Sequence, residues 1–232
     1  MKWLITFLKS SIGKKLLMSL TGLFLIMFLP VHLIGNFKLL ADDGGEKFNL
    51  YAQFMTTFTP IKLISYGLYF FILLHTFQGI LLWISNWRAK GKKYKKHGKN
   101  TRTGSRFMAH LGILIFIFLA VHLYQFWFQM KIGALEKLTY EVNGVTYTDV
   151  KNLYAPVQAA YSDIFFVIFY VACMIPIAFH LYHGFQSAFQ TLGLNHKKYT
   201  PLIRIVGTLY SIVIPLGFAY IPVYMYLFRN LN

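Results

Sequence analysis

The sequence predicts an all-α integral membrane protein made of five transmembrane helices. Of its 232 residues, 56% are hydrophobic and 19% are aromatic. The apolar runs are too long and too continuous for the one-sided helices of a soluble domain. Because a bilayer core of about 30 Å needs roughly 20 helical residues per crossing, we expect a single transmembrane domain over 1–232. Its helices should lie near residues 15–36, 60–87, 105–130, 157–191 and 201–228.

The first predicted helix is expected to be a retained span. It is preceded by Lys2, Lys9, Lys14 and Lys15, much as basic residues precede the apolar core of a signal peptide. Its apolar core is longer than that of a signal peptide, and no small-x-small cleavage site follows it.

The distribution of the formal charge of +16 indicates how the chain is oriented in a membrane, and we do not interpret it as a sign of nucleic-acid binding. The segment before the first span and the links after the second and fourth spans carry 16 of the 23 lysines and arginines and none of the seven acids. Positive charge in short loops marks the cytoplasmic side. We therefore expect a cytoplasmic N-terminus and, after five spans, a C-terminus outside.

Two further elements are predicted in the connections. Apolar residues recur at helical spacing in EKFNLYAQFMTTF, which predicts a short external helix in the membrane interface. Two β-rich stretches flank Asn143-Gly144, a pair favoured in two-residue turns, and predict a small external β-hairpin. The basic link from Arg88 to Arg106 is either a solvated orientation signal or a docking surface for an acidic cytoplasmic partner.

Four of the predicted spans each carry a histidine at membrane depth. These are His32, His75, His122 and His180. A titratable ring in hydrocarbon needs a partner, and the acids cannot supply it because all seven lie in or beside connections. Iron could satisfy the rings instead, and four of them suggest two bis-histidine sites. Cys173 is the only cysteine, so no C-x-x-C-H motif is present and any haem must be b-type.

Depth along the helices sorts these histidines into pairs. At about 1.5 Å per residue, His32 and His122 both lie roughly 25 Å from the inner ends of their spans. His75 and His180 both lie roughly 20 Å from theirs. We therefore expect His32 to pair with His122, and His75 with His180.

Small and polar residues near the second pair favour a haem. His75 and His180 share the pattern H-x-x-x-G, in which Gly79 and Gly184 leave room for a flat macrocycle, unless they only allow close helix packing. Two axial imidazoles leave no open position on the iron, so such a haem transfers electrons and binds no substrate. Candidate partners for the haem propionates near the inner ends include Ser19 and Arg106, which otherwise act as interfacial anchors.

With these histidine-bearing helices, the chain resembles the cytochrome b membrane-anchor subunit of succinate dehydrogenases and fumarate reductases. The similar form has one five-helix polypeptide enclosing two b haems. The resemblance covers nearly the whole chain: four histidine-bearing helices followed by one without, GGEKFNLYAQFM after the first helix, and FHLYHGFQSAFQTLG ending the fourth. It implies that His75 and His180 hold the haem nearer the cytoplasm, and that His32 and His122 hold the outer haem.

The same resemblance implies partners and a quinone site. A flavoprotein subunit that interconverts succinate and fumarate and an iron–sulfur subunit would bind on the cytoplasmic side of a bacterial inner membrane. This chain would anchor them and exchange electrons with menaquinone near the outer face, where Glu46 is either the residue that handles the quinone's protons or an ordinary loop acid. Ala178 stands where some fumarate reductases of this type carry a glutamate, so that proton route lacks its acid here. A dimer of the complex, the direction of the reaction and the haem potentials are left open.

Three alternatives remain at this stage. A di-haem cytochrome b of a hydrogenase or formate dehydrogenase would also carry histidines on membrane helices, and its co-purifying subunits would separate it. A transporter with a histidine proton relay usually needs acids inside the bundle, which this sequence lacks. A membrane di-iron oxygenase is the weakest alternative, because His180 and His183 form the only close membrane pair in the sequence.

Overall fold

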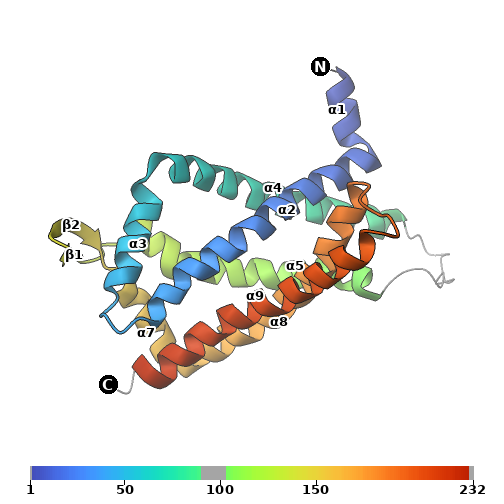
Figure 1. Cartoon of the computed structure of the whole chain (residues 1–232). Helices are drawn as coiled ribbons and strands as arrows, with labels where there is room; N and C mark the ends of the chain where they lie inside the picture. Colours follow the sequence, from blue (N-terminus) through green and yellow to red (C-terminus); the bar gives the residue numbers. More distant parts are fainter. Residues whose placement is uncertain (1, 90–102, 230–232) are drawn as a thin grey trace. The chain divides into compact units, whose positions relative to one another are not determined.

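The computed structural model describes residues 2–89 and 103–229, and these are predominantly helical (Figure 1). Within these residues, five helices are long and apolar enough to cross a membrane, as the sequence predicts. Most of the basic link between the second and third of them, with its predicted docking role, lies outside the described residues. The candidate spans are Ser11–Leu40, Thr59–Arg88, Phe107–Lys131, Ile164–Thr191 and Thr200–Arg229.

The elements can be followed by their labels in Figure 1. In chain order they are α1 (Lys2–Lys9), α2 (Ser11–Asn36), the 3₁₀ helix η1 (Phe37–Leu40), α3 (Glu46–Thr57), α4 (Thr59–Ala89), α5 (Thr103–His122), the π-helix η2 (Leu123–Phe128), α6 (Gln129–Lys131), β1 (Lys137–Val142), β2 (Val145–Lys151), α7 (Tyr154–Ser162), α8 (Ile164–Thr191) and α9 (Thr200–Arg229).

The chain forms two compact units, and each of the five long helices contributes a segment to both. Unit 1 comprises Met1–Phe28, Gly67–Phe116 and Pro176–Val213. Unit 2 comprises Leu29–Tyr66, Ile117–Ile175 and Ile214–Asn232.

The predicted fourth span, 157–191, is divided in the structure. The chain leaves the helical conformation at Asp163, which has φ −92° and ψ 117°, so α7 ends at Ser162 and α8 begins at Ile164. The Asp163 carboxylate accepts a hydrogen bond of 2.8 Å from the backbone N–H of Phe165. A short carboxylate in this position satisfies one of the free N–H groups at a helix start, which explains why the span begins seven residues later than predicted.

The predicted hairpin is present in unit 2. β1 and β2 pair antiparallel, with Val142 opposite Val145. Asn143 (φ 52°) and Gly144 (φ 76°) form the turn, and two positive φ angles are what a type I′ hairpin turn requires. The pairing shifts register between Leu138 and Tyr140, which is a bulge that bends the ribbon.

A proline inside α2 is compensated by a tyrosine from α9. Pro30 has no N–H, so the carbonyl of Ile26, one turn earlier, loses its helical hydrogen bond. The hydroxyl of Tyr210 donates to that carbonyl. In an apolar environment a freed carbonyl must find another donor, and Tyr210 therefore stabilises α2 at the break that precedes His32.

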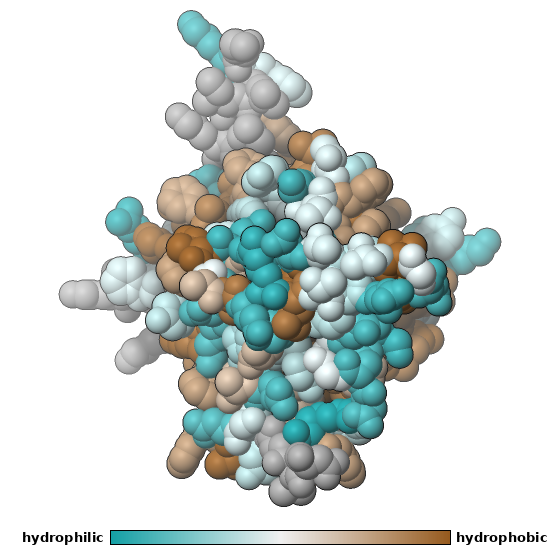
Figure 2. All heavy atoms as spheres, turned by 90° about the vertical axis from the view of Figure 1, so that its left-hand side faces the viewer, coloured by the Kyte–Doolittle hydropathy of each residue, from teal (hydrophilic) through white to brown (hydrophobic). Residues whose placement is uncertain are grey.

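A buried asparagine joins three segments of unit 2. Asn49 is fully buried in α3. Its Nδ2 donates to the Tyr140 hydroxyl (2.9 Å) and to Asn152 Oδ1 (3.2 Å), and its Oδ1 accepts from the Tyr154 N–H (2.9 Å). These bonds connect α3 with the hairpin and with the start of α7. Figure 2 views the side of the molecule that carries these elements, and hydrophilic residues gather across the middle of this face.

Candidate functional site

In unit 1 the structure brings His75 of α4 together with His180 of α8. Their ring centres are 6.3 Å apart and their planes meet at 73°. A metal–imidazole bond is about 2.0–2.1 Å and the ring centre lies about 1 Å further, so two imidazoles on opposite sides of one metal have ring centres about 6 Å apart. The separation observed is that of a pair able to share one metal.

In unit 2 the structure brings His32 of α2 together with His122, the last residue of α5. Their ring centres are 5.8 Å apart and their planes meet at 88°. This is the pairing that depth along the helices predicts, and its separation also suits two ligands of one metal. Each pair therefore lies within one compact unit and joins two different helices.

Aromatic rings surround the unit 2 pair. The ring centres of Phe118 and Phe126 lie 5.7 and 5.3 Å from the ring centre of His122. The ring centre of Phe218 lies 5.5 Å from that of His32. The π-helix η2 begins directly after His122. Single π-turns inside α-helices frequently occur at functional sites, because the extra residue per turn re-aims the side chains beside it.

Among the residues that the structure describes, one imidazole nitrogen of each pair has no hydrogen-bond partner. Nδ1 of His180 and Nδ1 of His122 are both buried without one. Leaving a buried polar atom unsatisfied costs about 1–3 kcal/mol. These rings are thus polar groups inside candidate spans that the described residues leave unsatisfied, which fits residues that hold a bound group.

Each histidine pair offers two protein ligands. Within 2–89 and 103–229, no three histidine, cysteine, aspartate or glutamate side chains are arranged to hold a metal ion. Structural and catalytic zinc sites take at least three protein ligands. A pair of imidazoles instead suits a metal whose other positions are filled by a macrocycle, as in haem.

The predicted accessory residues have mixed surroundings. A Cβ added at Gly184 would meet nothing within 4 Å, and one added at Gly79 would make only an ordinary contact with Met18 at 3.6 Å. Ser19 is buried, and its hydroxyl donates to the Lys15 carbonyl (3.0 Å), so that hydrogen is already used within α2. The side chain of Arg106 lies outside the described residues.

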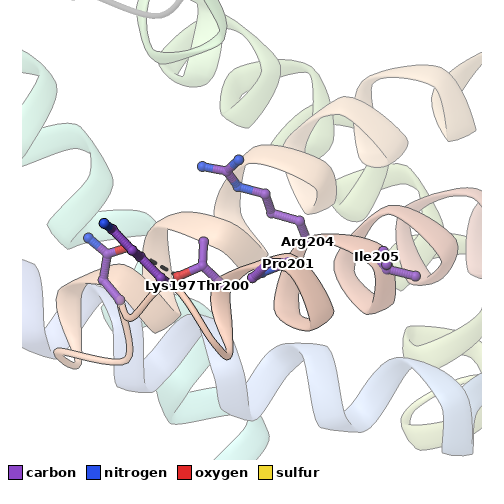
Figure 3. A pocket seen from close by; sticks show the side chains of 6 residues that line it. Lys197, Thr200, Pro201, Arg204 and Ile205 are labelled. Atoms are coloured by element: carbon purple, nitrogen blue, oxygen red, sulfur yellow. Dashed lines mark hydrogen bonds between the residues drawn. The ribbon is translucent and has the colours of Figure 1, made fainter.

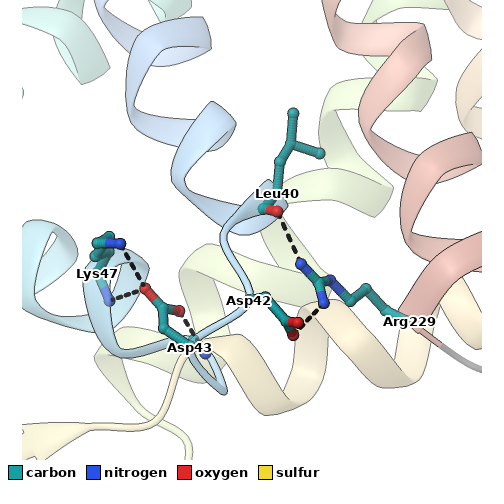
Figure 4. A network of polar contacts seen from close by, with 6 residues as sticks. Leu40, Asp42, Asp43, Lys47 and Arg229 are labelled. Atoms are coloured by element: carbon teal, nitrogen blue, oxygen red, sulfur yellow. Dashed lines mark hydrogen bonds and ion pairs between the residues drawn. The ribbon is translucent and has the colours of Figure 1, made fainter. Parts of the chain in front are cut away.

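A polar cavity in unit 2 lies where η1, the link to α3, α7 and the end of α9 meet. Its volume is about 320 Å³, and its lining includes Asp42, Tyr154, Gln158 and Arg229. Arg229 donates to the Asp42 carboxylate and, at 2.9 Å, to the Leu40 carbonyl (Figure 4). Burial raises the pKa of the Tyr154 phenol, so this group stays protonated and can donate a hydrogen bond.

Glu46 is near this cavity in sequence but does not line it. It is the first residue of α3 and is half-buried. The acid that lines the cavity is Asp42, whose side chain is 91% exposed. Asp43 is instead turned towards α3, where it accepts from the backbone N–H groups of Gly45 and Lys47.

A basic recess lies in unit 1 at the turn between α8 and α9. Its volume is about 590 Å³, and Lys197 and Arg204 line it together with Thr200 and Pro201 (Figure 3). The Thr200 hydroxyl donates to Asn195 Oδ1 (3.3 Å) at the start of α9. The recess belongs to one of the links that the charge distribution predicts to be cytoplasmic.

Sequence reasoning missed two residues beside these sites. Thr21 contacts the His75 ring from α2 (3.1 Å), and the only sequence signal was a polar residue inside a span. Arg229 was missed because its partners lie nearly two hundred residues earlier.

Comparison of the chain with protein-family models, with curated proteins and with solved structures found no match.

Proposed function

We propose that this chain is the di-haem cytochrome b subunit of a succinate:quinone oxidoreductase. It anchors a flavoprotein subunit and an iron–sulfur subunit to a bacterial inner membrane, and it transfers electrons between the iron–sulfur subunit and menaquinone. The observation that carries this proposal is the presence of two histidine pairs, each from two helices, with ring centres 6.3 and 5.8 Å apart. The resemblance stated from the sequence supplies the identity of the complex.

In this proposal His75 and His180 hold one b haem, and His32 and His122 hold the other. When bound, such a group would supply one-electron transfer, because the two imidazoles of a pair would leave the iron no position for substrate. The chain contributes by fixing the two rings of each pair from separate helices. It also surrounds the unit 2 pair with aromatic side chains, which keep water away and help set a redox potential.

The ligand assignment is tested by haem content. Replacing His75 or His180 should lower the two haems per chain to about one, and replacing His32 or His122 should remove the other one, which differs in its redox spectrum. His110→Leu is the matched control, because His110 is an exposed membrane-helix histidine outside both pairs and should leave both haems in place. Pyridine-haemochrome analysis of the purified protein measures the content, and a single-ligand variant with both haems would refute the assignment.

The quinone site is proposed beside the polar cavity of unit 2, near the end of the protein predicted to face outwards. Glu46 is the proposed residue for proton transfer to and from the quinone, and Asp42, which lines the cavity, is its closest competitor. Each can be replaced by its amide. Glu46→Gln should depress quinone turnover while succinate oxidation by an artificial acceptor persists. Loss of quinone turnover in Asp42→Asn, with none in Glu46→Gln, would transfer the role to Asp42.

The basic recess is proposed as part of the surface that faces the iron–sulfur subunit. Lys197 and Arg204 place two cations at this recess, and complementary charge guides and orients association more than it adds affinity. Identification of the subunits that co-purify with the chain tests this proposal and separates it from a hydrogenase or formate dehydrogenase.

A further inference from the structure

A threonine of α2 contacts one of the four paired histidines through its hydroxyl. Thr21 is 1% exposed. Its Oγ1 lies 3.1 Å from Nδ1 of His75, 2.9 Å from the Leu17 carbonyl and 3.1 Å from the Met18 carbonyl. α2 supplies no ring to this pair, so the contact comes from a third helix.

The contacts of Thr21 favour one position for the proton of the His75 ring. A hydroxyl has one hydrogen, and the shortest of the three contacts of Thr21 Oγ1 is with the Leu17 carbonyl (2.9 Å), which can only accept. With its hydrogen directed there, the hydroxyl offers a lone pair to His75. In this arrangement Nδ1 of His75 carries the hydrogen and the lone pair of the ring is on Nε2.

A glycine next to Thr21 lets the ring come close to α2. A Cβ added at Gly22 would lie 3.2 Å from Cε1 and 3.7 Å from Nδ1 of His75, which is tighter than most contacts of that kind. Thr21 and Gly22 thus form one surface beside His75. Thr21 is the hydrogen-bond partner of Nδ1, and Gly22 leaves room for the imidazole ring.

We propose that Thr21 is a positioning residue for the haem ligand His75: it accepts the Nδ1–H hydrogen bond and so presents Nε2 to the iron. This inference rests on the proposed function. Partners on the second nitrogen of a ligating histidine fix its tautomer and orientation and raise its basicity. A more basic ligand stabilises the oxidised iron, so the contact holds the potential of this haem lower than it would otherwise be.

The test compares Thr21→Val, which keeps the shape, with Thr21→Ser, which keeps the hydroxyl. Ser211→Ala is the matched control, because Ser211 is a buried hydroxyl of unit 1 that donates to the Thr208 carbonyl. Redox titration of the full complex should show a raised midpoint potential of the His75–His180 haem in Thr21→Val. The potential should return towards the original value in Thr21→Ser, and the His32–His122 haem should not change in any variant.

A second readout does not depend on haem. Nitrogen-15 NMR of the full-length chain, labelled at histidine and prepared without haem, reports the tautomer of His75. Thr21→Val should shift the ratio of the Nδ1–H to the Nε2–H form about fivefold towards Nε2–H, as expected for losing one hydrogen bond of about 1 kcal/mol. Loss of the haem in Thr21→Val but not in Thr21→Ser would also support the proposal.

Two results separate failure of this inference from failure of the proposed function. An unchanged potential and tautomer in Thr21→Val, with both haems bound, would overturn the role of Thr21. Equal loss of haem in Thr21→Val, Thr21→Ser and Ser211→Ala would overturn it too, because the hydroxyl would then matter only for packing. Absence of haem from the unaltered complex would refute the proposed function, while the NMR comparison would still test the hydrogen bond.

Discussion

The hydrogen bonds of Asn49 allow a prediction of local stability in unit 2. Asn49→Ala removes three hydrogen bonds and leaves the N–H of Tyr154, a buried residue, without its acceptor. An unpaired buried donor costs about 1–3 kcal/mol, and each of the other two bonds contributes about 0.5–1.5 kcal/mol. The free energy for locally opening this region should therefore fall by roughly 3 kcal/mol.

Hydrogen exchange followed by mass spectrometry measures this change where it occurs. Amides of α3, the hairpin and α7 should exchange about 100-fold faster in Asn49→Ala, since every 1.4 kcal/mol is about tenfold. Lys47→Ala is the matched control on the same helix. It removes only a 3.7 Å ion pair of a 65% exposed lysine with Asp43, which is worth less than about 1 kcal/mol.

The comparison of these two variants decides whether Asn49 holds the region together. If protection falls no further in Asn49→Ala than in Lys47→Ala, the three bonds do not stabilise the contact of α3 with the hairpin and α7. Uniform loss of protection in helices distant from α3 would also refute the reasoning, because it would indicate global instead of local opening.

Two further substitutions test particular contacts. Tyr210→Phe should lower stability by about 1 kcal/mol, because the carbonyl of Ile26 loses its donor; in a Pro30→Ala background, where the helix regains its own N–H, the loss should nearly disappear, as thermal unfolding in mild detergent would show. Gly45→Ala should destabilise more than Gly44→Ala in the same assay, since both have positive φ but only at Gly45 would a Cβ lie 2.3–2.7 Å from a neighbouring side chain. Equal effects within either comparison would contradict the assigned contact.

The five spans and the hairpin could be predicted because both depend on local sequence. Apolar runs long enough to cross a bilayer predict helices whatever their neighbours are, and Asn143-Gly144 accepts the two positive φ angles of its turn. The break at Asp163 was missed because apolar residues continue on both sides of it. Its signal was a helix-capping residue directly before Ile164, which outweighs the continuity of the run.

The histidine pairs could be anticipated in part, and their surroundings could not. Counting residues from the inner ends gives depth, and depth alone selects which rings can meet. The rotation of each helix about its axis decides which third residue approaches a ring, and no count along one helix contains that rotation. Thr21 and His75 are 54 positions apart, and Arg229 and Asp42 are 187 apart, so both contacts depend on packing of the folded chain.

The distribution of satisfied and unsatisfied polar atoms supports the importance of the histidine pairs. Inside a bilayer each polar group needs a partner from the protein or from a bound group. Two polar groups elsewhere in the candidate spans have such a partner: Tyr210 donates to the carbonyl freed by Pro30, and the hydroxyl of Tyr170 donates to Gln125 at 2.7 Å. In the described spans one ring of each histidine pair has a buried nitrogen without a hydrogen-bond partner, and a bound group at these pairs, as proposed above, would bring the rings the partner that a bilayer does not offer.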